Sequence, residues 1–391
     1  MLNLSTSLIW PGCAQGKYTV RAKGHILAVL SWGDAEAPLP GWGPFAYVPI
    51  DPAGNGTFFY PGRRGIPRGT THVWARCYAS DFGHREDVSA AIPAKYLPTA
   101  DEHDSPSKFS VLTDLHLAAK PGRVRQALRA AESNTILLLG DSTNDGLRAQ
   151  FATFETCVED AAPQKTVLPV AGNHDVLHPS RCGGSDDGCG NYEDFQSHLL
   201  TKAEKSGCGI SHDPDGRAYA ARVGGFDVIG LQCVTAGRRF TFPQGRQLDW
   251  LEEHLADTSA PWHIVLCHAP LLAHNPARNT GAPYLGGNGR LQEIVNRAGR
   301  VIFLSGHTHV SPNVLAGNGE YDERHRNVYL DCGSVVPTDT SGENGMMSPD
   351  WKDGCVTELS VTESVVEICM RSISSGARFP RGYYRFETEP S

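Results

Sequence analysis

The sequence contains no apolar run long enough to cross a membrane. Its longest apolar stretch covers residues 26–32, whereas a membrane-spanning helix needs about 20 such residues. The first residues also lack a basic segment followed by a long apolar one, so the sequence as written shows no signal peptide. We therefore expect no membrane contact. A cytoplasmic location is slightly favoured, but a trimmed secreted protein would look the same, so localisation stays open.

The chain also lacks an excess of positive charge. It carries 35 Lys and Arg residues against 43 Asp and Glu residues, which gives a formal net charge of −8. Proteins that hold nucleic acid without regard to its sequence need basic surface to bind the phosphate backbone. The charge balance therefore disfavours long nucleic acids as partners and favours small molecules.

An even number of cysteines is also missing. With 11 cysteines, complete pairing within the chain is impossible. Cys233, Cys267 and Cys369 lie in apolar runs, which favours buried thiols. Cys182 and Cys189 flank a segment rich in Gly and Asp, and a disulfide between them would close it as a loop. We give the paired and unpaired states of these two cysteines equal weight.

At 391 residues the chain exceeds the usual size of one hydrophobic core, so we expect two domains. Residues 1–104 contain short runs of alternating apolar residues, separated by Gly and Pro, at the spacing of a β-sandwich. A polar, Pro-containing stretch follows and resembles a linker. We predict a fibronectin- or immunoglobulin-like sandwich over 1–104. Its strands are expected near residues 18–21, 25–32, 57–60, 71–79 and 87–92.

From residue 105 onward, apolar runs alternate with helical patterns. The runs at 136–139, 264–266 and 301–304 lack alternation, which indicates strands buried on both faces. Residues 176–219 are polar and Gly-rich without a strong period, so we expect a long loop that is either a functional rim or a flexible excursion. Helices are expected in the segments 121–133, 148–158, 248–255 and 291–298. The prediction for 105–391 is a layered α/β domain with a β extension after residue 335.

Polar motifs follow five of the predicted strands, at the point where each strand ends. In an α/β sheet, the loops at the carboxyl ends of the strands gather along one edge, where sites are built. In GHTH, two histidines lie two positions apart, and in an extended backbone such side chains point the same way. The motifs are D-x-H at 114–116, GDSTNDG at 140–146, GNHD at 172–175, His268, and GHTH at 306–309.

These motifs supply carboxylate and amide oxygens and imidazole nitrogens, but no thiolate. Such donors suit Mn, Fe or Zn and disfavour a structural, Cys-rich zinc site. Seven donors are too many for one tetrahedral ion and suit two ions that share a carboxylate. The candidate ligands are Asp114, His116, Asp141, Asn173, His268, His307 and His309.

The order of the motifs resembles the calcineurin-like metallophosphoesterases over about residues 108–335. The resemblance implies a layered α/β-β/α sandwich that holds two transition metal ions. It also implies that Asp141 bridges the ions and that His174 lies near the leaving oxygen. The ligands implied for one ion are Asp114, His116 and His309, and those for the other are Asn173, His268 and His307.

The implied activity is hydrolysis of phosphate esters by a metal-bridging hydroxide, as a phosphatase or a phosphodiesterase acting on a small molecule. His174 would protonate the departing oxygen as general acid. Many relatives carry an Asp three positions after the bridging Asp to orient this histidine, whereas this chain has Asn144 there, followed by Asp145. Asn144 can still accept a hydrogen bond through its carbonyl. Asp145 is retained as a second catalytic candidate.

Two questions about the protein's role stay open at this point. Some members of the family act as inactive binding or scaffold modules, although the complete ligand set of this chain speaks against that role. The sandwich either shapes the rim of the site or mediates association into a homo-oligomer. Loop arginines available to hold a phosphate, which we do not rank, are Arg181, Arg217, Arg238, Arg239 and Arg278.

Overall fold

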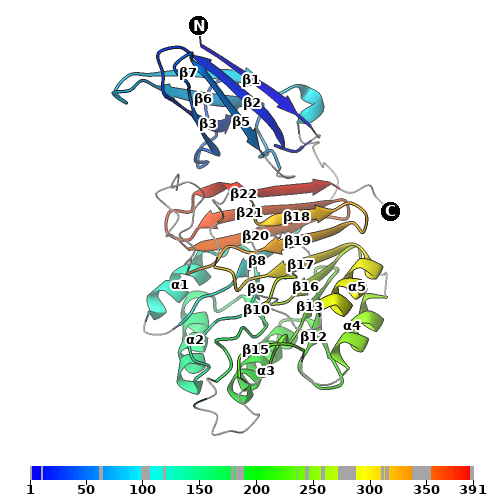
Figure 1. Cartoon of the computed structure of the whole chain (residues 1–391). Helices are drawn as coiled ribbons and strands as arrows, with labels where there is room; N and C mark the ends of the chain where they lie inside the picture. Colours follow the sequence, from blue (N-terminus) through cyan, green and yellow to red (C-terminus); the bar gives the residue numbers. More distant parts are fainter. Residues whose placement is uncertain are drawn as a thin grey trace.

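The chain folds into a small all-β part followed by a larger layered α/β part (Figure 1). The computed structural model describes residues 2–9, 12–60, 65–97, 106–117, 120–177, 180, 189–235, 237–242, 246–256, 260–271, 288–309, 312, 317–336 and 354–387.

Three residues singled out in the sequence lie outside this set: Arg181, Cys182 and Arg278. The disulfide between Cys182 and Cys189 therefore stays a prediction.

The N-terminal part consists of two antiparallel sheets, with strand orders β1-β2-β5 and β4-β3-β6-β7. Alternating apolar side chains of both sheets form one core, in which the Trp32 and Phe45 rings stack with centroids 4.1 Å apart. The predicted small β-sandwich is confirmed, while its boundary at residue 104 stays a prediction. The strands are β1 (Leu2–Leu8), β2 (Gly16–Ala22), β3 (Leu27–Gly33), β4 (Ala46–Pro49), β5 (Asn55–Tyr60), β6 (His72–Tyr78) and β7 (Arg85–Ala91), followed by the 3₁₀ turn η1 (Ala94–Tyr96).

The larger part is built on two sheets with strand orders β10-β9-β8-β20-β21-β22 and β11-β12-β13-β16-β17-β19-β18. Strands β8, β9 and β10 are parallel to one another, as are β13, β16, β17 and β19. The strands concerned are β8 (Ser107–Leu112), β9 (Thr135–Leu138), β10 (Thr166–Pro169), β11 (Gly209–His212), β12 (Tyr219–Val223), β13 (Phe226–Gly230), β16 (His263–Leu266), β17 (Val301–Ser305), β18 (Gly319–Asp322), β19 (Asn327–Asp331), β20 (Cys355–Val361), β21 (Val365–Ser372) and β22 (Arg378–Glu387).

The two sheets face each other across a shared core and carry helices on their outer faces. Phe109 of β8 and Ile264 of β16 belong to the core between the sheets. Other strand residues face the helices. Leu138 of β9 belongs to a core formed with α1, α2 and α3, and Phe303 of β17 belongs to a core formed with α4 and α5. This arrangement confirms the α/β-β/α sandwich. The helices are α1 (Pro121–Ala130), α2 (Arg148–Ala161), α3 (Gly190–Lys205), α4 (Gln247–Leu255) and α5 (Asn288–Ala298).

The prediction of one long loop over residues 176–219 is wrong, because α3 and β11 lie inside it. Helix α3 buries Tyr192, Phe195, Leu199 and Ala203, which recur at helical spacing. The Phe195 ring stacks on Phe151 of α2 with centroids 4.8 Å apart. The spacing of these residues could have predicted the helix, but the Gly- and Asp-rich residues 183–188 that precede it favoured the prediction of a single loop.

The uninterrupted apolar runs are strands with no solvent-facing side, as predicted. Every residue of β9, β16 and β17 is buried. Loops at the ends of such strands start from fixed positions, so they can hold side chains in place. Among the described residues, no helix is long and apolar enough to span a bilayer.

The sandwich contacts the edge of the six-stranded sheet through β21 and β22 (Figure 1). Arg68 forms an ion pair with Glu367 at 2.8 Å, and the Trp42 ring lies edge-on to Tyr383 with centroids 5.4 Å apart. Arg381 Nε donates to the main-chain oxygen of Phe45 at 3.0 Å. These polar and aromatic contacts attach the sandwich to the C-terminal strands of the chain.

Candidate metal centre

The candidate ligands occupy loops that leave the carboxyl ends of strands in both sheets. Asp114 and His116 follow β8, Asp141 follows β9, Asn173 follows β10, and His268 follows β16. His307 and His309 follow β17. The structure therefore brings together at one edge the residues that the sequence separates by nearly 200 positions.

Several candidate ligands at this edge have a strained backbone with a positive φ angle. Left-handed φ angles are rare for residues other than glycine, and the conformation persists where the surrounding structure enforces it, often at functional sites. Nine such residues occur in the described chain, and five are candidate ligands. Those five, with their φ angles, are Asp114 (53°), His116 (47°), Asp141 (49°), His307 (70°) and His309 (56°).

Two glycines allow the loops after β9 and β10 to approach closely. A Cβ atom on Gly172 would lie 2.2 Å from Asp141 Oδ1, and one on Gly140 would lie 2.5 Å from the main-chain nitrogen of Gly172. Any other residue at either position would push the two loops apart. The glycines therefore bring the Asp141 carboxylate against the 172–174 segment.

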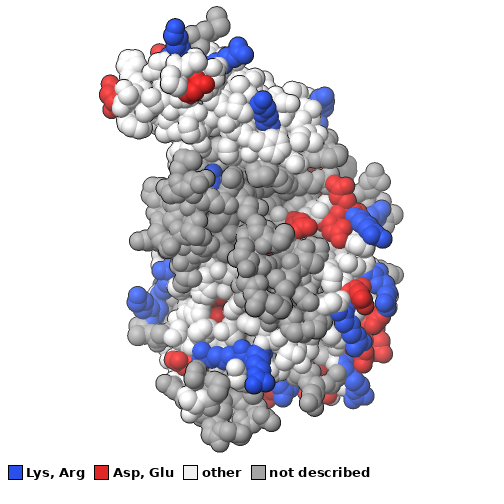
Figure 2. All heavy atoms as spheres, viewed as in Figure 1, with Lys and Arg blue, Asp and Glu red and all other residues white. Residues whose placement is uncertain are grey.

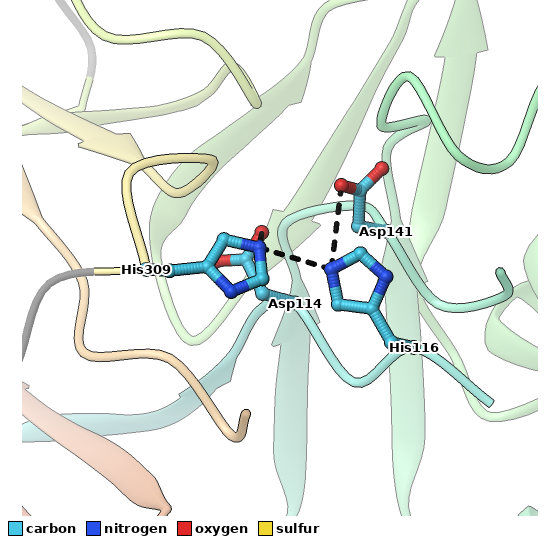
Figure 3. A group of neighbouring side chains, drawn as sticks. All are labelled: Asp114, His116, Asp141 and His309. Atoms are coloured by element: carbon cyan, nitrogen blue, oxygen red, sulfur yellow. Dashed lines mark hydrogen bonds and ion pairs between the residues drawn. The ribbon is translucent and has the colours of Figure 1, made fainter. Parts of the chain in front are cut away.

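One group of side chains contains Asp114, His116, Asp141 and His309 (Figure 3). Their ligand atoms all lie within 4.8 Å of one another. The Nε2 atoms of His116 and His309 are 2.9 Å apart, and His309 Nε2 lies 3.4 Å from Asp114 Oδ1. His116 Nε2 lies 3.7 Å from Asp141 Oδ2. Two imidazole nitrogens and two carboxylates converging in this way form a plausible ligand set for one cation.

A second group contains Asp141, His268 and His307, with ligand atoms again within 4.8 Å of one another. His268 Nε2 lies 3.4 Å from Asp141 Oδ2, the same oxygen that faces His116 in the first group. Asn173 belongs to neither group, but its neighbour His174 donates its main-chain N–H to Asp141 Oδ1 at 2.7 Å, which brings the 172–174 segment against the shared carboxylate. Asp141 is thus the one residue common to both groups.

Hydrogen bonds from the far side of the rings fix which nitrogen faces the centre. His268 Nδ1 lies 2.6 Å from the main-chain oxygen of Leu139, and His309 Nδ1 lies 2.7 Å from that of Val336. A carbonyl oxygen only accepts, so Nδ1 carries the proton in both rings and Nε2 is free to coordinate. Main-chain carbonyls therefore select the tautomer that a metal site needs.

Several buried polar atoms of the cluster support cation binding. Among the described residues, Asn173 Oδ1 is buried without a hydrogen-bond partner, and the buried atoms Asp141 Oδ2 and His268 Nε2 have only ion-pair contacts, the shortest being the one between them at 3.4 Å. A buried polar atom without a partner costs about 1–3 kcal/mol, so such atoms usually serve a ligand. All three can donate an electron pair to a cation. The residues therefore fit oxygen- and nitrogen-bound transition metal ions.

The pKa values of the candidate ligands also indicate a site suited to a cation. Burial disfavours the charged imidazolium and lowers the pKa of His116 to about 4 and that of His307 to about 3. Burial also opposes charge on His268, but the adjacent Asp141 carboxylate outweighs it and raises the pKa of His268 to about 10. The Asp141 pKa is itself held below its ordinary value, because its histidine neighbours outweigh the effect of burial. A buried carboxylate among imidazoles is an environment in which a cation would replace protons.

His174 lies next to the first group, with its ring edge-on to His116 at a centroid distance of 4.7 Å. Its Nδ1 donates to the carbonyl oxygen of Asn144 at 2.8 Å. The acceptor is the main-chain oxygen of Asn144, whereas the sequence suggested only that this residue could accept through a carbonyl. Asp145 is turned elsewhere: its carboxylate accepts from Gln150 Nε2 at 3.0 Å, and its N–H donates to Gln150 Oε1 at 3.0 Å. The structure brings His174 to the cluster, whereas the Asp145 side chain bonds Gln150 in the first turn of α2.

Asp175 is a residue whose importance the sequence did not reveal, although it completes the GNHD motif. Its carboxylate is fully buried and accepts from the main-chain N–H groups of Ser142 (3.2 Å), Thr143 (2.9 Å) and Gly172 (3.0 Å). The Thr143 hydroxyl donates to it at 3.1 Å. Asp175 therefore joins the loop that carries Asp141 to the loop that carries Asn173.

We predict that Asp175→Ala destabilises the protein by about 3 kcal/mol or more, because three buried N–H groups lose their acceptor at about 1–3 kcal/mol each. Chemical denaturation of the metal-free protein measures the free energy of unfolding. The control is Asp160→Ala, which removes an exposed ion pair with Arg125 and should change stability by less than about 1 kcal/mol. Equal effects of the two substitutions would contradict the organising role of Asp175.

The chain is similar to several known proteins. A Synechococcus sp. protein named "Probable cyclic nucleotide phosphodiesterase" is 25% identical over 211 residues, which cover 51% of this chain and 71% of that protein. The structure of PhoD is 11% identical with a TM-score of 0.43, covering 99% of this chain and 90% of that chain. The phosphopantetheinyl hydrolase of Mycobacterium tuberculosis is 12% identical with a TM-score of 0.36, covering 63% and 98%.

The family model described as calcineurin-like phosphoesterase matches residues 107–311, more than half of the chain. The matched segment contains every candidate ligand and His174. The chain belongs to the calcineurin-like phosphoesterase family.

Proposed function

We propose that this phosphoesterase hydrolyses small phosphodiesters at a centre of two transition metal ions. The observation that carries the proposal is the position of Asp141, whose carboxylate belongs to both groups of candidate ligands. A single carboxylate between two ligand sets is what a pair of neighbouring ions requires. Mn, Fe or Zn all suit donors of this kind.

In this proposal the two ions have separate ligand sets that meet at Asp141. Thr308 separates the histidines of GHTH, and its hydroxyl donates to Asp331 Oδ2 at 2.5 Å. That bond fixes the turn between the two rings. Asp114, His116 and His309 would hold one ion, whereas Asn173, His268 and His307 would hold the other.

The chemistry is divided between the ions and the protein. Two bound ions would polarise the phosphoryl oxygens and make water a stronger nucleophile at neutral pH. As the oxygen of water bonds to phosphorus, the ester P–O bond breaks and the departing oxygen needs a proton. With Nδ1 donating to Asn144, the second nitrogen of His174 carries a proton in the imidazolium form of the ring, and it can deliver that proton to the departing oxygen, which leaves the ring neutral. His174 would therefore act as general acid.

The substrate class follows from similarity and surface charge. The Synechococcus relative is named as a cyclic nucleotide phosphodiesterase, so cyclic nucleotides are the first diesters to test. On the described part of the face in Figure 2, basic and acidic side chains are mixed along the right-hand edge, and a short row of basic side chains lies below the centre. A long nucleic acid would need a more extensive basic surface, and the formal net charge of −8 favours small diesters.

A direct assay tests the proposal. Mn-supplemented protein is incubated with p-nitrophenyl phosphate, with bis(p-nitrophenyl) phosphate and with a 3′,5′-cyclic nucleotide. We expect hydrolysis of the two diesters to exceed that of the monoester, and a chelator to abolish it. A preference for the monoester would overturn the diester assignment. Inactivity on all three, with metal bound, would instead favour a binding or scaffold module.

A further inference from the structure

A short hairpin outside the ligand motifs contacts the second group of the centre and the loops beside His174. Strands β14 (Val234–Thr235) and β15 (Arg239–Phe240) pair antiparallel. The Phe240 ring packs edge-on against His307, with centroids 4.6 Å apart, and stacks along His268 at 6.1 Å. Phe240 thus fixes one end of the hairpin against the second group.

The turn of this hairpin directs Arg238 toward His174. Arg238 has a left-handed φ of 61°, and its N–H donates to the Thr235 oxygen at 3.1 Å. Its NH2 group donates to the main-chain oxygen of Asn144 at 3.3 Å, and its Nε donates to that of Val176 at 3.4 Å. Asn144 lies in the loop after β9, whereas Val176 lies in the loop after β10 that also carries His174. One guanidinium therefore connects the loop that carries His174 to the loop whose carbonyl orients it.

The oxygen of Asn144 receives two donors at once, because it also accepts from His174 Nδ1 at 2.8 Å. A carbonyl oxygen has two lone pairs and can serve both. We propose that Arg238 is a positioning residue that acts through this carbonyl, holding it where it fixes the ring of His174. The proposal rests on the function proposed above, in which His174 delivers a proton to the leaving oxygen.

The need for such a residue follows from the local sequence. His174 is oriented by a main-chain carbonyl of a loop, and a loop carbonyl moves more easily than a side chain on a rigid element. The Asp145 carboxylate, which could have been an alternative, pairs with Gln150. A fixed cation on the outer side of the Asn144 oxygen would limit that movement.

A competing role for Arg238 is direct binding of the substrate phosphate. The two roles differ in the kinetic constant that loss of Arg238 would change. A phosphate-binding arginine would raise KM for all esters alike, whereas a residue that positions a general acid lowers kcat most for leaving groups that need a proton. Methyl phenyl phosphate and methyl p-nitrophenyl phosphate form a matched pair, because p-nitrophenolate departs readily without protonation and phenolate does not.

The kinetic experiment compares these two substrates in the metal-loaded enzyme. For Arg238→Ala we expect the fall in kcat on methyl phenyl phosphate to exceed that on methyl p-nitrophenyl phosphate by about tenfold, a fraction of the 10²–10⁴ of general acid catalysis. Added to His174→Ala, the same substitution should change kcat by less than about twofold, since residues acting as a unit are not additive. The control is Arg239→Ala, an exposed neighbour in the same hairpin, which should leave the substrate ratio unchanged.

A second readout does not depend on activity. Nuclear magnetic resonance of protein with isotope-labelled histidine detects the Nδ1 protons of the rings. The signal of the His174 Nδ1 proton is the one that is missing from the spectrum of His174→Ala. We expect Arg238→Ala to shift this signal or speed its exchange with water, while the Nδ1 proton of His268, bonded to Leu139, stays unchanged and reports an intact fold. Arg238→Lys, which keeps the charge, should restore part of the wild-type signal.

The outcomes separate the two proposals. Equal losses on both substrates with an unmoved His174 proton would overturn the positioning role and leave the phosphodiesterase assignment standing. A raised KM with unchanged kcat on both would show that Arg238 binds the phosphate. Wild-type protein inert on every ester would overturn the proposed function and, with it, the catalytic consequence of Arg238.

Discussion

Asp141→Asn is expected to lower hydrolysis by at least about a thousandfold and to release both metal ions. The substitution keeps the shape of the side chain but removes the negative charge that both ligand groups share. Two-metal centres contribute several kcal/mol to the transition state, and about 4 kcal/mol corresponds to a thousandfold in rate. Metal content and kcat are measured on the same reconstituted sample.

A neighbouring carboxylate provides the matched control for this prediction. Asp145→Asn lies in the same loop, changes the same charge and can keep its contacts with Gln150. We expect it to retain both ions and to lose less than about tenfold in kcat. A loss as large as that of Asp141→Asn would support the catalytic role that the sequence suggested for Asp145, and would show that its contacts with Gln150 are not its main function.

His174→Ala is expected to show the opposite combination, with metal retained and turnover reduced. Only the ring is removed, and the main-chain N–H of residue 174 still donates to Asp141 Oδ1 as it does in the native protein at 2.7 Å. General acid catalysis contributes about 10²–10⁴ in rate. We therefore expect a loss of this size in kcat on alkyl and phenyl esters, and a smaller loss on p-nitrophenyl esters.

Metal analysis makes this second prediction specific. If His174→Ala lost its ions, the residue would be part of the metal centre and its proposed role as proton donor would be wrong. If it kept its ions but lost activity equally on all esters, the ring would serve substrate binding or a step other than protonation. Full activity on every substrate would exclude the general acid role.

The convergence of the candidate ligands could be predicted from the sequence because they occur in a strong local pattern. Each ligand follows an apolar strand such as β9 or β17, every residue of which is buried. A strand of this kind can only lie inside a sheet, and the carboxyl ends of parallel strands meet at one edge. Polar residues just beyond such strands were therefore expected to converge, and Asp114, Asp141 and His268 do so.

The contacts that orient these ligands could not be predicted in the same way. His268 and His309 are fixed by the carbonyls of Leu139 and Val336, and His174 by that of Asn144. Every residue has a main-chain carbonyl, so the side-chain sequence does not mark which ones serve a site. Asp175 could have been suspected from its place in GNHD, but its three main-chain donors appear only when two loops are brought together.

The same limit applies to Arg238. Arg238 is one of several loop arginines, and only the left-handed turn and the position of β14 and β15 show that it reaches Asn144.

Helix α3 is a different case, because its buried residues Tyr192, Phe195 and Leu199 recur at helical spacing and could have predicted the helix. The Gly- and Asp-rich residues just before it favoured the prediction of a single loop.

The most direct test of the central claim is the metal stoichiometry of the wild-type chain, measured with its phosphodiesterase activity. Purified protein is stripped with a chelator, titrated with Mn, and analysed by elemental mass spectrometry after removal of free ions. The proposed ligand sets predict that activity rises until about two ions are bound per chain. Fewer than one bound ion per chain in protein that hydrolyses diesters at full rate would contradict the dinuclear centre.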